Sequence, residues 1–249
     1  MADTREKRNV TDEEWELRRK LAIICRVLGM QGHIGLYGHV SIRVPNTDIV
    51  LMTPGAGSEK TAARIDQIFV FNLAGTILYH PGGDKPMQIP AEWRIHTQIH
   101  KDRPEIGSVA HLHAHASTLL GIVGQDIVPV FSQGGVIAGG VPTWDDPRMV
   151  LNDQEAVSLS QTLGKHIACQ MRGHGSVVVG ETVEQALTVC TFMEENAQYQ
   201  LEAIPLGGPK LFPPEIWERL FAQRRGGMGG NRLLWDYWER KVVVEGLPL

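Results

Sequence analysis

Histidines alternate with apolar residues in one segment, Val109-Ala110-His111-Leu112-His113-Ala114-His115. Successive side chains of a β-strand point to opposite faces, so an extended chain here aims His111, His113 and His115 in one direction. Neighbouring imidazoles on such a face start roughly 6.5 to 7 Å apart at their backbones, close enough for two rings to reach a single ion. The alternative is a solvated sheet face that binds nothing, but the apolar neighbours favour a metal site. Its remaining ligands must come from elsewhere in the chain.

Two other segments supply candidates to complete this site. His174 lies between glycines in Gly173-His174-Gly175, directly before an apolar run, where a loop can aim its side chain inward. Taken alone, it is equally well an ordinary loop histidine. Glu92 lies at the start of a predicted helix, where the helix dipole favours a carboxylate. A competing metal set, Glu92, His96 and His100, has the spacing of one helix face, but such a face more often only carries polar groups on the outer side of its helix.

Hydrophobic periodicity and capping signals predict the elements that must position these residues. Thr11, Asn152 and Thr182 each have the side chain of a helix N-cap, with Glu or Gln three residues on. We predict strands at 39–44, 49–52, 68–72, 76–79, 109–115 and 177–179, and helices at 11–30, 90–101, 152–167, 182–197 and 213–221. Since strands and helices do not alternate strictly, this order predicts a single three-layer α/β/α domain of the α/β class.

The composition suits one sizeable globular domain over residues 1–249, with residues 210–249 as a C-terminal helical tail. The net charge is −4 and basic residues are not massed in any segment, which argues against nucleic acid or an anionic membrane as the partner. A small-molecule partner is expected instead. Three widely spaced cysteines exclude a disulfide framework. The charged N-terminus and the lack of a run of roughly 18 apolar residues predict a cytoplasmic protein.

The order and spacing of three segments resemble the class II aldolase/adducin family. These segments are Glu92-Trp93-Arg94-Ile95-His96, His111-Leu112-His113-Ala114, and Gly173-His174-Gly175 before a valine strand. The resemblance extends from the first helix to about Ala203. It implies a class II aldolase type of domain with a central, mainly antiparallel or mixed sheet, and a homotetramer with sites at subunit boundaries.

The resemblance also implies a ligand set. His111, His113 and His174 would hold one divalent metal ion per subunit, with Glu92 as a fourth ligand or as a catalytic acid/base. Zinc, manganese, iron and cobalt all suit such ligands. His115 has no counterpart among the family's ligands, so we expect it to pack or to form a hydrogen bond.

The segments that hold phosphate in sugar-phosphate aldolases of the family are altered in this chain. Those enzymes use an Asn in Gly-Asn-x-Ser-x-Arg, a Thr-Pro-x-Gly-like turn and a Ser-Ser pair before the glutamate. Here the Asn is replaced by His39, and Pro90 and Ala91 replace the two serines. Because phosphate sites depend on several converging donors, a phosphorylated sugar is disfavoured. In this respect the chain is similar to family members that decarboxylate hydroxylated aromatic or pyridine carboxylic acids.

We therefore expect a metal-dependent lyase of aromatic compound catabolism whose substrate is a hydroxy carboxylic acid. Loss of carbon dioxide leaves a carbanion that a chelated metal stabilises as an enolate, and Glu92 or a water molecule then delivers a proton. His39, Ser41, Thr53 and Gly55 are expected to bind and orient the acid group. Aldol cleavage of a hydroxy-ketone or sugar phosphate is the alternative reaction, and an adducin-like interaction scaffold is the alternative without enzymatic activity.

The tail is rich in aromatic and basic residues, and we count Tyr237 among the candidate substrate contacts. Together these residues could supply a cation and an aromatic wall to the substrate. An ordinary amphipathic helix or a subunit contact is the favoured alternative. The residues are Arg232, Trp235, Tyr237, Trp238 and Arg240.

Overall fold

The computed structural model of the protein describes residues 10–81, 88–219 and 228–244. Their middle layer is an eight-stranded sheet in the order β4-β3-β2-β1-β5-β8-β7-β6. Neighbouring strands are antiparallel except β6 and β7, which are parallel, so the expected mixed sheet is confirmed. The strands are β1 (His39–Arg43), β2 (Ile49–Met52), β3 (Phe69–Asn72), β4 (Ile77–Tyr79), β5 (Ser108–Leu112), β6 (Thr143–Trp144), β7 (Ala168–Met171) and β8 (Gly175–Gly180).

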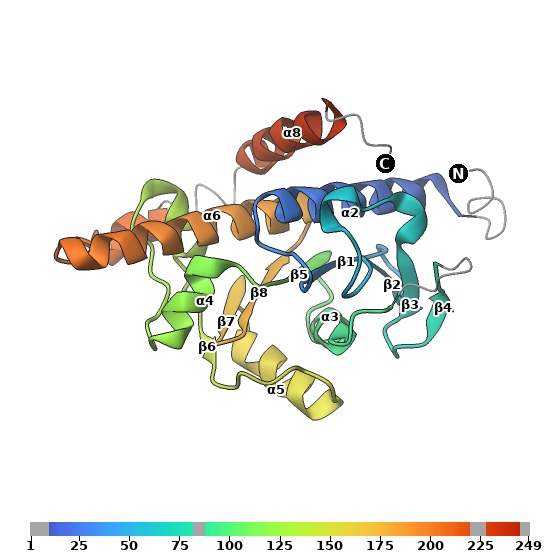
Figure 1. Ribbon diagram of the computed structural model, residues 1–249, viewed down its shortest axis with the longest axis horizontal. Coiled ribbons are helices and arrows are strands. Elements are labelled where there is room, and N and C mark those ends of the chain that lie inside the picture. The colour runs from blue at the N-terminus through green and yellow to red at the C-terminus, as the bar shows by residue number, and fades with distance from the viewer. Residues whose placement is uncertain (1–9, 82–87, 220–227, 245–249) are drawn as a thin grey trace.

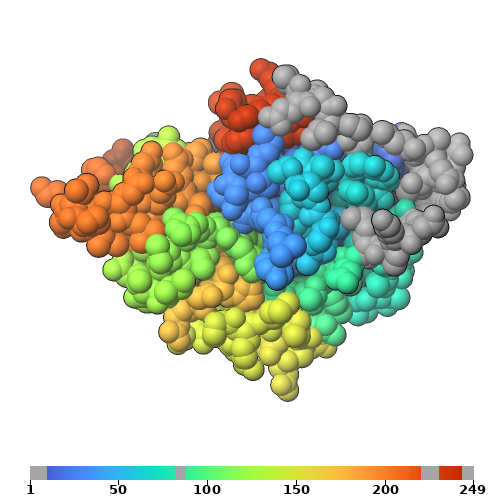
Figure 2. All heavy atoms as spheres, viewed as in Figure 1, coloured from blue at the N-terminus to red at the C-terminus, as the bar shows by residue number. Residues whose placement is uncertain are grey.

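Helices cover both faces of the sheet (Figure 1). On one face lie α2 (Asp12–Met30) and α6 (Val183–Ala203), and on the other α3 (Trp93–Asp102) and α5 (Asp153–Leu163). The remaining long helices are α4 (His115–Ile122), which packs on α6, and α8 (Met228–Val244), which packs on α6 and α2. Figure 2 shows α8 and α5 at opposite edges of the molecule.

Shorter helical segments complete the described chain. Residues 214–219 are helical, which agrees with the predicted helix at 213–221 as far as the description reaches; residues 220 and 221 lie outside it. Short 3₁₀ helices occupy Lys60–Ala62, Ile65–Gln67, Ser132–Ile137 and Ile204–Leu206.

Local capping explains why three of the predicted helix starts are confirmed, whereas the helix predicted from residue 90 begins at Trp93. The side chains of Thr11, Asn152 and Thr182 each accept a hydrogen bond from the backbone N–H three residues on, at 3.1, 2.9 and 3.2 Å. Such a cap satisfies an N–H that the helix leaves unpaired, and contributes about 1 kcal/mol.

Alternation along β5 assigns its side chains to two cores. Ala110 and Leu112 belong to the larger core, under α2 and α6. Val109 belongs to the second core, with Ile95 of α3. Because side chains two residues apart share a face, His111 lies on the α3 side of the sheet with Val109.

The predicted histidine strand is shorter than expected. It ends at Leu112, and His115 is the exposed first residue of α4. The expectations that His115 shares the face of His111 and that it is packed are therefore wrong. The carboxylate of Glu194, on α6, accepts hydrogen bonds from the N–H groups of Ala116 and Ser117 at the start of α4. This long-range cap favours a helix where the alternation predicts strand.

Two further findings concern the chain as a whole. Cys25, Cys169 and Cys190 are buried and free, which confirms the prediction that they form no disulfide framework. Among the helices that the structure describes, none is both long enough and apolar enough to cross a membrane.

Candidate metal centre

Four side chains that the sequence suggests as metal ligands converge in the structure. Donor atoms of Glu92, His111, His113 and His174 all lie within 4.8 Å of one another. Glu92 Oε2 is 3.4 Å from His111 Nε2 and 3.6 Å from His174 Nε2. The ring centroids of His111 and His113 are 4.7 Å apart, and each is 5.1 Å from the centroid of His174. Three segments that are distant in sequence thus meet at one point.

The backbone explains this convergence. His111 lies on β5, and Glu92 is the N-cap residue of α3, which packs on the same face of the sheet. His174 directly precedes β8, the antiparallel neighbour of β5. Gly175 permits a close approach, because a Cβ atom at this position would collide with the carbonyl oxygen of Leu112. A larger residue would push His174 away from the strand that carries His111.

Main-chain carbonyl groups orient two of the histidine rings. His111 Nδ1 lies 3.2 Å from the carbonyl oxygen of Ser176, and His174 Nδ1 lies 3.1 Å from that of Arg148. A carbonyl oxygen only accepts hydrogen bonds, so each neutral ring carries its proton on Nδ1 and a lone pair on Nε2. The nitrogens close to Glu92 are therefore those able to coordinate a metal.

The centre also contains buried atoms with no partner. Among the described residues, nothing forms a hydrogen bond with His111 Nε2 or His113 Nε2, although both atoms are buried. An unpaired buried polar atom costs about 1–3 kcal/mol. Three imidazoles and a carboxylate are ligands that zinc, manganese, iron and cobalt accept, with zinc bonds of about 2.0–2.2 Å. In their types and their convergence, the residues present fit one divalent ion.

The protonation states of two groups agree with metal binding. Burial raises the pKa of Glu92, but the adjacent rings of His111 and His174 outweigh it, and the pKa lies well below its usual range. The N–H of Val150 adds a hydrogen bond of 2.9 Å to Glu92 Oε1. Burial, with His111 and His174 beside it, lowers the pKa of His113 to about 3. The centre presents an ionised carboxylate and a neutral imidazole, as coordination requires.

The structure separates the residues of the alternative metal set, Glu92, His96 and His100. Glu92 belongs to the cluster, whereas His96 and His100 do not. Both histidines are completely buried, so the expectation that this helix face is an outer, polar one is wrong. Helix α3 turns these residues towards the sheet, because the i, i+4 spacing that aligns them with Glu92 places all three on its inner face.

His96 and His100 continue a polar chain that starts beside the cluster. The ring of His39 lies 5.1 Å from that of His111, and its Nδ1 is 2.7 Å from His96 Nε2. His96 Nδ1 is 2.8 Å from Ser41 Oγ, which is 3.1 Å from His100 Nε2. The structure thus places His39 next to the cluster, while the Ser41 hydroxyl connects His96 to His100. The roles of His39 and Ser41 as substrate contacts stay predictions.

The turn that contains Thr53 and Gly55 packs against the segment that leads to Glu92. The N–H of Gly55 donates to the carbonyl oxygen of Gln88 at 2.8 Å, and a Cβ at this glycine would lie only 2.9 Å from the same oxygen. Thr53 is completely buried, and its Oγ1 accepts from the N–H of Val40 at 3.0 Å. The turn is near the centre, but this threonine hydroxyl already has a backbone partner.

One predicted substrate contact lies away from the centre, and one residue that was not predicted holds the turn beside it. Tyr237 lies 59 % exposed on α8, across the sheet from the cluster, so within one chain the structure does not bring it there. Sequence reasoning missed Lys60, whose buried Nζ donates to the carbonyl oxygens of Pro54 and Gly55 at 2.6 and 3.0 Å. Lys60 holds the turn in place, and no local pattern marks it.

The fold and this centre agree with the comparisons with known proteins. The family model described as Class II Aldolase and Adducin N-terminal domain matches residues 19–201, so the chain belongs to this family. The 3,4-dihydroxyphthalate decarboxylase of Rhodococcus jostii is 28% identical over 244 residues, 94% of this chain and 98% of that protein. The 5-methylthioribulose-1-phosphate/5-deoxyribulose-1-phosphate aldolase of Rhodospirillum rubrum is 29% identical over 194 residues, 75% of this chain and 80% of that protein.

Solved structures confirm the expected class II aldolase fold. An aldolase II superfamily protein from Pseudomonas syringae has a TM-score of 0.86 at 24% identity and covers 98% of both chains. The L-fuculose 1-phosphate aldolase from Glaciozyma antarctica has a TM-score of 0.82 at 20% identity and covers 94% of this chain and 92% of that one. The family and the relatives together support a lyase, and they include both decarboxylases and aldolases.

Proposed function

We propose that this protein is a divalent-metal-dependent carbon–carbon lyase that decarboxylates a hydroxylated aromatic or heteroaromatic carboxylic acid. The observation that carries the proposal is the convergence of Glu92, His111, His113 and His174, where two buried imidazole nitrogens have no partner among the described residues. The relative from Rhodococcus jostii supports decarboxylation, since the similarity extends over nearly the whole of both chains.

The three histidines and Glu92 would hold one ion per subunit, and its identity as zinc, manganese, iron or cobalt is left open by the ligand types. When bound, a divalent ion supplies a Lewis acid that stabilises the negative charge developing in the substrate. His111 and His174 are prepared for this role, because carbonyl groups fix their Nδ1 protons and leave Nε2 free.

Glu92 would also act as the acid/base. Its Oε1 accepts a hydrogen bond from Val150, while Oε2 faces His111 and His174. Departure of carbon dioxide leaves an electron pair on the ring carbon, to which a proton must be added. The ionised carboxylate of Glu92 can take the proton of a substrate hydroxyl and transfer it to that carbon, so that carbon dioxide and a phenolate are formed.

The substrate side of the proposal involves His39 and the turn at 53–55. The turn lies against residues 88–90 and is fixed by Lys60, so it is a rigid edge beside Glu92. Pro90 and Ala91 offer no side-chain donor for a phosphate there. We therefore propose that the substrate carries a carboxylate and hydroxyl groups rather than a phosphate.

The second candidate is aldol cleavage of a hydroxy-ketone or sugar phosphate. Its specific support is the relative from Rhodospirillum rubrum, an aldolase with 29% identity. The same centre suits both reactions, because each leaves a carbanion next to an oxygen that a cation can stabilise.

A substrate panel decides between the two reactions. Metal-loaded protein is offered ortho-hydroxy aromatic acids, hydroxy-ketones and sugar phosphates, while release of carbon dioxide and of aldehyde is followed. We expect carbon dioxide from at least one aromatic acid. Aldehyde from a sugar phosphate, with no carbon dioxide from any acid, would reverse the assignment.

An interaction scaffold of the adducin type is the alternative outside enzymes. Metal analysis separates it from a lyase, since a scaffold needs no stoichiometric divalent ion. The proposed homotetramer would give the 210–249 tail, including the exposed Tyr237, a place at a subunit boundary. Sedimentation analysis of the purified protein tests that assembly.

A further inference from the structure

A chain of four side chains connects the metal centre to a backbone carbonyl group. It starts at His39, whose ring lies 5.1 Å from the ring of His111. It continues through His96, Ser41 and His100, with contacts of 2.7, 2.8 and 3.1 Å. It ends where His100 Nδ1 lies 3.1 Å from the carbonyl oxygen of Ile106.

The carbonyl end gives this chain a direction. The oxygen of Ile106 only accepts, so His100 carries a proton on Nδ1, and its Nε2, when the ring is neutral, accepts the hydroxyl proton of Ser41. The oxygen of Ser41 then accepts from His96 Nδ1. The remaining lone pair of His96, on Nε2, accepts from His39 Nδ1. In a neutral His39 the lone pair is left on Nε2.

The opposite direction needs a charged His100. For Ser41 to donate to His96, both nitrogens of His100 would have to carry protons. Burial lowers the pKa of His100 to about 4, and the neighbouring guanidinium of Arg43 acts in the same sense. His100 is therefore neutral at pH 7, and only the first direction satisfies every contact.

We propose that this chain fixes His39 as a hydrogen-bond acceptor, with its Nε2 lone pair beside the metal centre, and so selects a substrate hydroxyl there rather than an anionic oxygen. The two nitrogens of an imidazole point in nearly opposite directions, so Nε2 lies on the side of the His39 ring away from His96. A carboxylate or phosphate oxygen cannot donate to it, whereas a phenolic hydroxyl can.

The sheet places this acceptor next to the ligands. His39 and His111 are directly paired in the register of β1 and β5, so their side chains share the α3 face. A neutral ring also suits this position, because a cation on it would repel a divalent ion at the centre. His96, Ser41 and His100 act through His39 and are positioning residues. The selection of a hydroxyl rests on the proposed function, but the protonation pattern does not.

Nuclear magnetic resonance of protein with ¹⁵N-labelled histidine tests the pattern without any reaction. The probe is the zinc-loaded protein at pH 7, with the His39 signals assigned by their loss in His39→Asn. We expect Nδ1 of His39 to be protonated and Nε2 to be unprotonated. A proton on Nε2 of His39, alone or together with one on Nδ1, would overturn the proposal whether or not the protein is a decarboxylase.

A ligand pair tests the selection of a hydroxyl. A dihydroxybenzoic acid and its mono-methyl ethers are compared for binding to the zinc-loaded protein, because an ether cannot donate. One ether should bind about tenfold more weakly than the parent acid, the usual effect of one hydrogen bond. This ratio should shrink in Ser41→Ala, where the direction of the chain is no longer fixed, and persist in Ser41→Thr, which keeps the hydroxyl. An unchanged ratio in Ser41→Ala would refute selection through the chain.

Discussion

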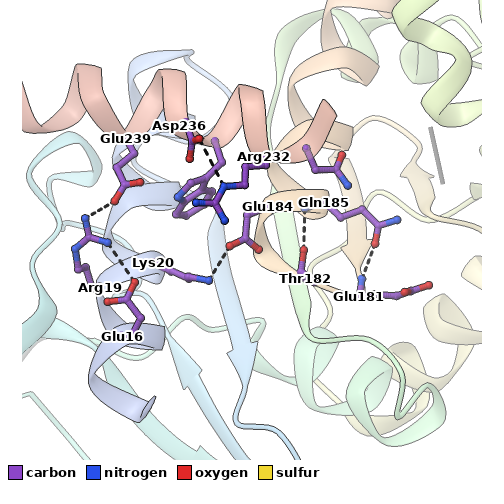
Figure 3. Close-up of a pocket in the computed structure, with 12 residues that line it drawn as sticks. Glu16, Arg19, Lys20, Glu181, Thr182, Glu184, Gln185, Arg232, Asp236 and Glu239 are labelled. Atoms are coloured by element: carbon purple, nitrogen blue, oxygen red, sulfur yellow. Dashed lines mark hydrogen bonds and ion pairs between the residues drawn. The ribbon is translucent and has the colours of Figure 1, made fainter. Parts of the chain in front are cut away.

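Polar side chains are concentrated on both faces of the sheet. Most of those on one face are paired with one another, whereas some of those on the other face have no hydrogen-bond partner among the described residues. Between α2, the start of α6 and α8 lies a pocket of about 420 Å³ (Figure 3). Most of its charged groups point towards one another, whereas the carboxylate of Glu181 points away from them. The pairs are Arg19 with Glu16 and Glu239, Lys20 with Glu184, and Arg232 with Asp236. On the α3 face, by contrast, His111 Nε2 and His113 Nε2 are buried without a hydrogen-bond partner among the described residues.

The difference teaches that ligand atoms with unmet bonding capacity, where several converge at one point, mark the functional site better than empty volume does. Ion pairs near water each contribute about 0–1 kcal/mol and are complete without a ligand. Buried lone pairs at the metal centre cost free energy until something binds them. The contrast predicts that substitutions on the α3 face change activity greatly, whereas those in the charged pocket change stability slightly.

The largest effect is expected for Glu92→Gln. The amide keeps the size of the side chain but cannot take up and deliver a proton, a role that contributes about 10²–10⁴-fold in rate. Turnover of the best substrate should fall by that factor in metal-loaded protein. The matched control is Glu155→Gln. It changes a carboxylate that caps α5, and it should retain turnover. Full activity of Glu92→Gln would refute the acid/base role.

His113→Ala should abolish stoichiometric metal binding. Loss even of a partner that only supports a ligand typically costs about 10- to 100-fold in metal affinity, and loss of a ligand should cost at least as much. Elemental analysis after dialysis measures the metal content. His115→Ala is the control, because this exposed histidine lies two residues away on the same segment. Equal metal content in the two variants would remove the basis for the comparison of the two faces.

How much the sequence predicts depends on how local each contact is. The starts of α2, α5 and α6 follow from caps within three residues, and β1 to β4 from short β-rich runs, so these are predicted closely. The candidate ligands followed from alternation in β5 and from the resemblance. His115 was misplaced because Glu194, far along the chain, caps α4.

The polar chain behind His39 was not predicted for a related reason. The alternation of His39 and Ser41 on β1 and the spacing of His96 and His100 on α3 are both visible in the sequence. Either pattern alone is compatible with a solvated face. Only the packing of α3 over β1 and β5 brings the two sets together, and that packing is decided by the apolar cores on the two faces of the sheet.

Acidification should destabilise the protein through the α3 face. His100 has its pKa lowered from 6.5 to about 4 in the folded state, so between these values the unfolded chain binds more protons. The free energy of unfolding is therefore unaffected by this group above about pH 6.5 and falls by about 3 kcal/mol as the pH drops to about 4. Urea unfolding of metal-free protein at several pH values measures the slope.

His100→Gln isolates this contribution from those of other groups. The slope between pH 6.5 and 4 should be shallower in this variant than in the wild type, even if the variant is less stable at pH 7. His115→Gln is the control at an exposed position and should keep the wild-type slope. Parallel slopes for the wild type and His100→Gln would contradict a buried neutral His100.

The smallest effect is expected in the charged pocket. Lys20 Nζ lies 2.7 Å from Glu184, but the two side chains are 30% and 21% exposed, so water already solvates much of both charges. Lys20→Gln should lower the free energy of unfolding by about 1 kcal/mol or less, with metal content and turnover unchanged. Thermal unfolding and metal analysis of the same preparation measure both. A tenfold loss of turnover or of metal in Lys20→Gln would mean that the pocket takes part in function. The pairing of its charges would then not distinguish the pocket from the metal centre. A lack of hydrogen-bond partners would no longer serve to identify the functional site.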